Sequence, residues 1–153
     1  MAIPIINLSS LDGSNGFRLD GEAQYDLSGQ VSTAGDVNGD GFDDVIVGAF
    51  GADQNALGSG SSYVVFGNAG GFNASMNLAD LDGNNGFRMD GEGINDSLGT
   101  SISNAGDVNG DGFDDVIVSA PDADSNGYNL GTSYVVFGKP SGFSAAFDLS
   151  SLN

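Results

Sequence analysis

The chain of 153 residues contains no cysteine, no histidine and no tryptophan, and only three prolines. Without cysteine no disulfide framework can form, so the sequence leaves the redox compartment open. Without histidine the chain lacks the usual base at neutral pH and the commonest ligand of transition metals. A Ser-His-Asp or Cys-His catalytic arrangement is therefore excluded within the chain.

Basic residues and long apolar stretches are scarce as well. Three Lys and Arg stand against 21 Asp and Glu, a formal charge of −18, which repels nucleic acid and anionic lipid and excludes both as partners. No apolar run approaches membrane-spanning length, and the opening MAIPIINLSS shows no visible signal peptide. Halophilic adaptation would scatter the acids over the surface, whereas here they recur at fixed places, as expected if cations neutralise some of them.

Glycine is abundant, with 26 residues, and 39% of the chain is hydrophobic, including ten Phe and four Tyr. A chain rich in glycine, poor in proline and interrupted by apolar segments is typical of many tight turns between short strands. The length suits one domain with a sizeable core.

The sequence repeats itself. The segment AGDVNGDGFDDVIVGA, which begins at Ala34, returns at Ala105 with a single change, and the flanking segments repeat at a spacing of 70 or 71 residues. Such near-identity indicates an excised or engineered fragment. We expect a first repeat in residues 1–75, a second in residues 76–147 and the start of a third in residues 148–153.

Each repeat holds four short apolar segments separated by Gly, Asn and Asp. The runs VIV and YVVF are typical of strands covered on both faces, and no segment keeps a helical period. Four strands per repeat predict an all-β fold of β-propeller blades, with two four-stranded antiparallel blades per chain. The expected strands are Phe17–Asp20, Gln30–Ala34, Val45–Ala49 and Ser62–Phe66, followed by Phe87–Asp90, Ser101–Ala105, Val116–Ala120 and Ser133–Phe137.

Two blades do not close a propeller, which typically has ~4–8, and they would leave apolar faces bare. If the segment GFRLDG is the outermost strand of a preceding blade, the chain begins with an unpaired outer strand and ends with a blade lacking one. Copies arranged head to tail would supply the missing strand to each other. We therefore expect a homo-oligomer, a trimer giving six blades or a tetramer giving eight.

The repeated acidic segment DVNGDGFDD reads as a metal loop. Alternation directs the side-chain oxygens of its first, third and fifth residues inward, and a carbonyl and an Asp follow at the seventh and ninth. Hard oxygen ligands in this number suit Ca²⁺ better than Mg²⁺. Asp43 and Asp114 are expected to turn outward and only add negative potential. The expected ligands are Asp36, Asn38, Asp40, Phe42 through its carbonyl and Asp44 in the first loop, and Asp107, Asn109, Asp111, Phe113 through its carbonyl and Asp115 in the second.

Two other interpretations of this segment can be weighed. An EF-hand needs Glu at the twelfth position, where Val47 and Val118 stand. A metal-free hairpin is the remaining alternative, since NGDG is good turn chemistry by itself. Repulsion among several carboxylates within nine residues disfavours that hairpin.

The loop and its surroundings resemble the FG-GAP repeats of the integrin α-subunit β-propeller and of similar bacterial calcium-binding proteins. The loop matches D-x-N-x-D-G-x-x-D, and the Gly-Ala-Pro element stands as Ser119-Ala120-Pro121 in the second repeat and as Gly48-Ala49-Phe50 in the first. Leu98-Gly99 matches the Phe-Gly element, which is degraded to Ser28-Gly29 in the first repeat. The resemblance implies one structural Ca²⁺ per repeat, two per chain, between the inner strands of a blade. It also implies a parent protein that is extracellular or at the cell surface.

These features predict a calcium-stabilised, non-catalytic structural or interaction module. A carbohydrate-binding or adhesion propeller is the alternative, with Tyr25 and Tyr128 as candidate aromatic platforms for a glycan, and a protein ligand is equally open. Glu22 and Glu92 are the only carboxylate pair that suggests glycoside hydrolysis. Their equivalent positions in the two repeats favour a structural role, and we expect no enzyme.

Recurring aromatic and basic residues are expected to be scaffolding. Arg18 and Arg88 occupy the same place in each repeat and should pair with neighbouring acids. The phenylalanines that recur with the period should pack between blades; they are Phe17, Phe66, Phe72, Phe87, Phe137 and Phe143.

Overall fold

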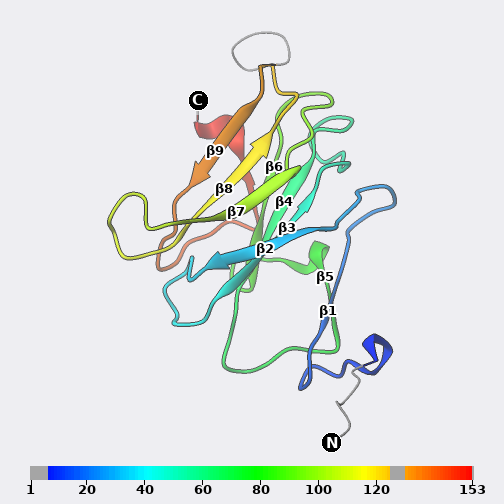
Figure 1. The fold of residues 1–153 in the computed structure, drawn as a ribbon, viewed down its shortest axis with the longest axis vertical. Coiled ribbons are helices and arrows are strands. Elements are labelled where there is room, and N and C mark those ends of the chain that lie inside the picture. Colours follow the sequence, from blue (N-terminus) through cyan, green and yellow to red (C-terminus); the bar gives the residue numbers. More distant parts are fainter. Residues whose placement is uncertain (1–6, 125–129, 153) are drawn as a thin grey trace, which may run out of the picture.

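The computed structural model of the chain describes residues 7–124 and 130–152, and these ranges contain short strands and 3-10 turns but no α-helix (Figure 1). The strands are β1 (Arg18–Asp20), β2 (Gln30–Gly35), β3 (Asp44–Ala49), β4 (Ser61–Val65), β5 (Ser75–Asn77), β6 (Gly86–Asp90), β7 (Ser101–Gly106), β8 (Asp115–Ala120), β9 (Thr132–Val136) and β10 (Ala146–Asp148). The 3-10 turns are η1 (Leu8–Ser10), η2 (Leu78–Asp80) and η3 (Leu149–Leu152).

All eight strands that the sequence predicts are confirmed, each within one residue at either end. β5 and β10 were not predicted. They are three residues long and carry no continuous apolar run, so local pattern gives them no signal. Each forms by pairing in parallel with a distant strand, β5 with β1 and β10 with β6.

The first blade contains strands from both sequence repeats. Its antiparallel part runs β2-β3-β4-β6, and β10 adds a parallel strand at the outer edge. In this sheet Tyr63 of β4 lies opposite Arg88 of β6. The segment GFRMDG thus forms the fourth antiparallel strand of the preceding blade, with β10 outside it, which is the phase expected for its counterpart GFRLDG.

The second blade has three strands, β7-β8-β9, in the described part of the chain. It repeats the register of the first blade: Val118 lies opposite Tyr134, as Val47 lies opposite Tyr63. Of the two four-stranded blades expected, the chain therefore completes the first and supplies three strands of the second. The strand expected to be unpaired, β1, instead forms a two-stranded parallel sheet with β5.

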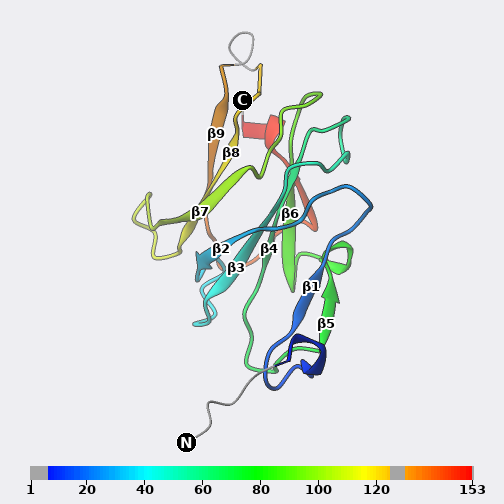
Figure 2. The same ribbon diagram turned by 45° about the vertical axis from the view of Figure 1, so that its right-hand side comes forward.

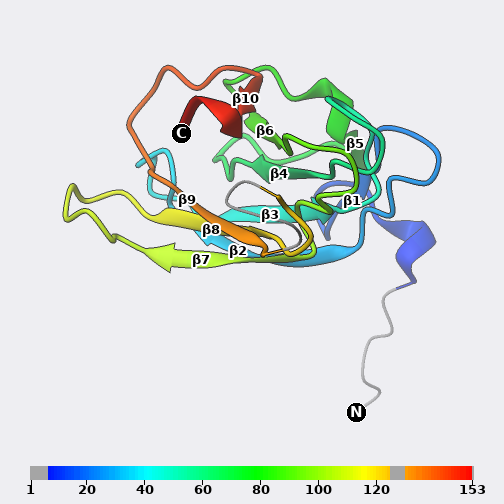
Figure 3. The same cartoon turned by 90° about the horizontal axis from the view of Figure 1, so that it is seen from above.

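The two blades and the β1–β5 sheet form successive layers. Seen from above, β10, β6, β4, β3 and β2 follow one another across the first blade, and β9, β8 and β7 follow in the same direction (Figure 3). The innermost strands β2 and β7 lie side by side. On the other side of the first blade, the β1–β5 sheet packs against side chains of β3 and β4 (Figure 2).

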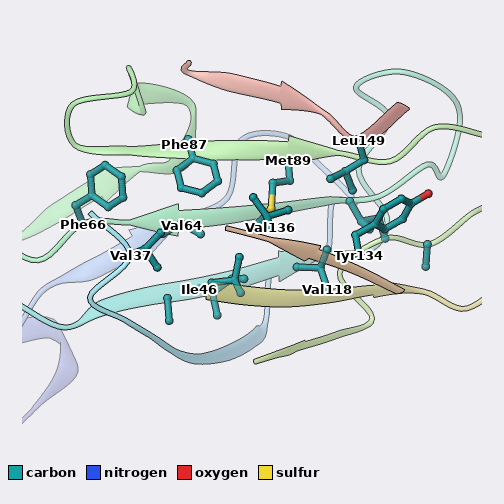
Figure 4. Close-up of a cluster of buried hydrophobic side chains, with 14 of the residues drawn as sticks. Val37, Ile46, Val64, Phe66, Phe87, Met89, Val118, Tyr134, Val136 and Leu149 are labelled. Carbon is teal, nitrogen blue, oxygen red and sulfur yellow. The ribbon is translucent and has the colours of Figure 1, made fainter. Parts of the chain in front are cut away.

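Two apolar clusters fill the spaces between these layers. The larger one packs Ile46 and Val64 of the first blade against Val118 and Val136 of the second (Figure 4). The smaller one packs the opposite face of the first blade, including Val47 and the buried Tyr63, against side chains of β1 and β5. Around β4 the first blade is therefore covered on both faces, as the continuous apolar run YVVF predicts, whereas Val31 of β2 and Val45 of β3 stay exposed on the side of the β1–β5 sheet.

Candidate metal centre

Two acidic loops lie at the same end of the molecule, where β2 turns into β3 and β7 turns into β8. The turn in the first loop depends on Gly39 and Gly41, whose φ angles of 72° and 89° lie in the left-handed region that favours glycine. Gly110 and Gly112 have similar φ angles of 78° and 93° in the second loop. The sequence NGDG therefore fixes the same reversal in both repeats.

In the first loop, the side-chain oxygens of three predicted ligands gather around this turn. Asp36 Oδ1 and Asn38 Oδ1 both accept from the backbone N–H of Asp40, at 3.0 and 2.9 Å. Asp36 Oδ2 accepts from Gly41 N at 3.0 Å, and Asn38 Nδ2 donates to Asp40 Oδ2 at 3.0 Å. Phe42 donates its backbone N–H to Asp40 Oδ1 at 2.9 Å.

The second loop has the same geometry. Asp107 Oδ1 and Asn109 Oδ1 both accept from Asp111 N at 3.0 Å, and Asp107 Oδ2 accepts from Gly112 N at 2.9 Å. Phe113 N donates to Asp111 Oδ1 at 3.0 Å. Because the pattern recurs atom for atom, it is determined by the local sequence of the loop.

The last predicted ligand of each loop, Asp44 or Asp115, lies buried at its base. Asp44 accepts from Val37 N at 2.9 Å and from Gly67 N at 2.8 Å, so it joins the loop to the end of β4. Asp115 makes the two equivalent bonds, to Val108 N and Gly138 N. Burial raises the pKa of Asp44 to about 6, and repulsion from Asp40 and Asp36 adds to the rise, while the two backbone hydrogen bonds oppose it.

The donor set of both loops fits a hard divalent cation. Within the described residues no group of three or more acidic side chains is arranged so that it could hold a metal ion. In the first loop, backbone amides donate to the carboxylate oxygens of Asp36 and Asp40. A carboxylate oxygen has two lone pairs, so an amide partner does not exhaust it. Carboxylate, amide and carbonyl oxygens without sulfur or imidazole are the ligands of Ca²⁺ rather than of transition metals.

Asp114 has a role that the sequence interpretation missed. Its Oδ2 accepts from Asp36 N at 2.9 Å, and its own backbone N–H donates to Asp36 O at 3.2 Å. Asp114 therefore joins the second loop to the first predicted ligand of the first loop, across the two blades. The expectation that it only adds negative potential was wrong. The sequence signal that could have pointed to this role is the second Asp beside the predicted ligand in each repeat, in the pairs Asp43-Asp44 and Asp114-Asp115.

Away from the loops, the two glutamates form cross-links between strands and loops. Glu22 accepts from Tyr63 Oη at 3.0 Å and from Arg88 at 3.1 Å, and Arg88 also contacts Asp90 at 2.7 Å. Burial raises the pKa of Tyr63, and the charge of Glu22 adds to the rise. Glu92 accepts from Tyr134 Oη at 2.8 Å in the same way. This use of both glutamates supports the structural role expected for them.

The remaining candidate residues are placed as follows. Arg18 pairs with Asp20 at 2.6 Å, which confirms, as for Arg88, pairing with neighbouring acids. The Tyr25 side chain is 76% exposed, in the loop between β1 and β2. Tyr128 lies outside the described residues.

Comparison with known proteins agrees with this geometry. The family model described as FG-GAP repeat matches residues 28–65 and 98–136. Integrin alpha-4 of Xenopus laevis is 30% identical over 132 residues, 86% of this chain and 12% of that protein. Integrin alpha-PS5 of Drosophila melanogaster is 37% identical over 105 residues, 66% of this chain and 9% of that protein.

The chain thus spans about a tenth of the length of these curated relatives. Each of the two matched segments begins just before the inner strand of a blade, includes one acidic loop and ends in the third strand, β4 or β9. With its all-β blades, its loop geometry and this match over half its length, the chain belongs to the FG-GAP repeat family.

Proposed function

We propose that this chain is a calcium-stabilised, non-catalytic interaction module of the β-propeller type, with one Ca²⁺ per acidic loop. The observation that carries the proposal is the convergence of the Asp36, Asn38 and Asp40 oxygens on one turn, repeated in the second loop. The similarity to integrin α-subunits supports a role in adhesion or binding.

Calcium would act here through linkage between binding and folding. Asp36, Asn38, Asp40, the Phe42 carbonyl and Asp44 would hold one ion, and their counterparts in the second loop would hold the other. The bound ion supplies positive charge that offsets the mutual repulsion of these carboxylates. A cation that binds only the folded loop adds RT ln(1 + [Ca²⁺]/Kd), roughly 2.7 kcal/mol per site at ~100 times Kd.

The decisive experiment is thermal unfolding in millimolar calcium and in excess EDTA. We expect a higher midpoint in calcium, with most of the gain lost in the double variant Asp40→Ala/Asp111→Ala. Asp80→Ala is the control, because it removes a carboxylate from an exposed residue outside both loops. Equal midpoints in calcium and EDTA would overturn the proposal.

We propose no catalysis because the two glutamates that could form a catalytic pair are engaged in structural contacts. Glu22 accepts hydrogen bonds from Tyr63 and Arg88, and Glu92 accepts one from Tyr134. The two carboxylates therefore bind different partners and do not form a facing pair. With no histidine or cysteine in the chain, neither a Ser-His-Asp nor a Cys-His arrangement can form within it.

A glycan ligand is the second candidate, favoured by the exposed ring of Tyr25. An exposed aromatic ring provides the flat apolar surface on which a sugar ring can stack. A glycan array probed with the chain and with Tyr25→Ala tests this candidate. Binding that is lost in the variant would support it, and an array without signal would dismiss it.

For the parent protein we propose an extracellular or cell-surface location, by analogy with the integrin relatives. Within the described ranges, every helix is too short to cross a lipid bilayer. Cell-surface labelling of the parent protein on intact cells tests this location.

A further inference from the structure

Two apolar surfaces of the molecule are bare, one on each blade. The leading face, on the first blade, consists of Val31 and Val45 with Phe17 and Leu19 of the neighbouring β1 segment, and it borders an open hollow of about 350 Å³. The trailing face, on the second blade, consists of Val108, Ile117 and Phe137. Val31 is 73% exposed and Phe137 is 51% exposed.

The counterparts of these residues form the interface between the two blades of the chain. Val116, the counterpart of Val45, is fully buried, and Ile102, the counterpart of Val31, packs against the larger cluster. On the trailing side, Val37, Ile46 and Phe66 are the counterparts, and all three are buried in that cluster. Each bare face therefore carries one half of an interface that the molecule already contains.

We propose that the leading face of one copy packs on the trailing face of a second copy, head to tail, with β1 of that copy extending the sheet at β9. The packing interface between the first and second blades of one chain would thus be repeated between two chains. The occupant of both faces is another copy of this chain, because each face complements the other and neither complements itself.

Compared with its counterpart β4 in the first blade, β9 has one strand partner fewer in the described part of the chain. In the first blade, β4 pairs on one side with β3 and on the other with β6. In the described part of the chain its counterpart β9 pairs with β8 alone. By the register of β4 and β6, β1 of the second copy would place Arg18 opposite Tyr134. With β5 already paired to β1, the new sheet would run β5-β1-β9-β8-β7, matching the order β10-β6-β4-β3-β2.

The aromatic rings provide an independent match. Phe87 and Phe143 stack with centroids 4.7 Å apart, and Phe66 packs against this pair at 6.0 and 5.2 Å. Their counterparts Phe17 and Phe72 stack in the same way, at 4.0 Å and 7° between planes. Phe137, the counterpart of Phe66, would then pack on the Phe17–Phe72 pair of the second copy, since it is half exposed in the single chain.

Charge also fits. Arg88 joins Glu22 at 3.1 Å across the first blade, in addition to its contact with Asp90. In the proposed sheet, Arg18 of the second copy occupies the place of Arg88, and Glu92 occupies the place of Glu22. Arg18 is exposed and brings one of the three basic side chains of a strongly acidic chain to this contact.

The second copy would also complete the surroundings of the second metal loop. Asp114 accepts from Asp36 N between the blades of one chain. Asp43, its counterpart, is exposed, and in the second copy it would accept from Asp107 N in the same way. A Cβ at Gly39 would overlap the Phe113 ring, whereas a Cβ at Gly110 meets nothing within 4 Å, so the place for Phe42 of the second copy is open.

Native mass spectrometry and light scattering of the full chain in millimolar calcium test the proposal first. We expect a closed assembly of three or four copies, giving a ring of six or eight blades. A monomer at micromolar concentration would overturn the proposal. Val31→Asp and Phe137→Asp should each yield a folded monomer, because both side chains are exposed in the single chain. Ile94→Asp is the control: Ile94 is 68% exposed, and its counterpart is the polar Gln24.

Mixing the two variants tests the head-to-tail direction. Val31→Asp keeps an intact trailing face and Phe137→Asp an intact leading face, so their mixture should form a one-to-one heterodimer and nothing larger. Assembly through like faces would leave one of the two variants assembled on its own, and that result would overturn the proposal. Circular dichroism of each variant checks that the chain remains folded.

Discussion

The two repeats have nearly the same sequence and very different surroundings. Val37 is fully buried and its counterpart Val108 is 59% exposed, while Phe66 is buried and Phe137 is half exposed. On the other face of the blade the residue of the second repeat is the buried one: Val116 is fully buried, and its counterpart Val45 in the first repeat is exposed. The first repeat therefore shows its residues with a following blade but without a preceding one, and the second repeat shows them with a preceding blade but without a following one.

This difference separates local from non-local causes. Every hydrogen bond inside the first acidic loop recurs in the second, which adds one from Gly110 N to Asp107 Oδ1, because these bonds depend on residues a few positions apart. Burial differs, because it depends on which sheet lies against the residue. Each matched pair of positions can therefore be used as an internal control. The predictions below use the Val31→Asp background, in which we expect the chain to be monomeric.

The largest difference is expected between Phe66→Ala and Phe137→Ala. Phe66 packs against two other rings in the larger cluster, so its truncation should lower the free energy of unfolding by about 4 kcal/mol. Phe137→Ala should cost much less, because half of that side chain is already in water. Urea unfolding of both variants measures the difference, and equal losses would mean that the repeats share one environment.

A smaller difference is expected between Arg88→Ala and Arg18→Ala. Loss of Arg88 leaves the buried Asp90 and the half-buried Glu22 without their cation and should cost about 2 kcal/mol, less than a fully buried pair. Arg18 pairs with Asp20 on the surface, so its removal should leave the monomer's unfolding unchanged. A loss for Arg18→Ala as large as that for Arg88→Ala would contradict the different surroundings of the two pairs.

Asp114→Ala and Asp43→Ala should differ in the same direction by a smaller amount. Asp114 accepts a hydrogen bond from Asp36 N across the blades, and its loss should lower the free energy of unfolding by about 1.5 kcal/mol. Asp43 is exposed, and its removal should have little effect on the monomer. Thermal unfolding of the two variants in EDTA isolates this contact from calcium binding.

The smallest effect is expected in calcium affinity. In the first loop the predicted ligand Asp36 is held by Asp114, and Gly39 lies against Phe113, whereas in the described residues no other blade contacts the counterparts Asp107 and Gly110 of the second loop. A loop held in place loses less entropy on binding, so the first site should bind several-fold more tightly. Calorimetric titration of Asp40→Ala and Asp111→Ala, each retaining one intact site, measures the two affinities. Equal values would show that the contact between loops does not influence the ion.

The sequence predicted much of the fold because the signals were local. The runs VIV and YVVF, bounded by glycine and Asn-Gly turns, located eight strands to within one residue. It did not predict β5 and β10, which are stabilised by strands about 55 to 60 residues away in the chain. For the candidate site, the sequence selected the acidic residues of both loops, but Asp114 was misjudged because its partner belongs to another blade.

The amino-acid sequence alone determined the strands, the glycine turns and the hydrogen bonds within each acidic loop, because these depend on neighbours along the chain. Only the tertiary structure decided which copy of a repeated residue is buried, which strand borders which blade, and that Asp114 contacts Asp36. The physical reason is that burial and pairing between blades depend on what occupies the adjacent space. Two identical segments therefore differ whenever only one of them has a neighbour.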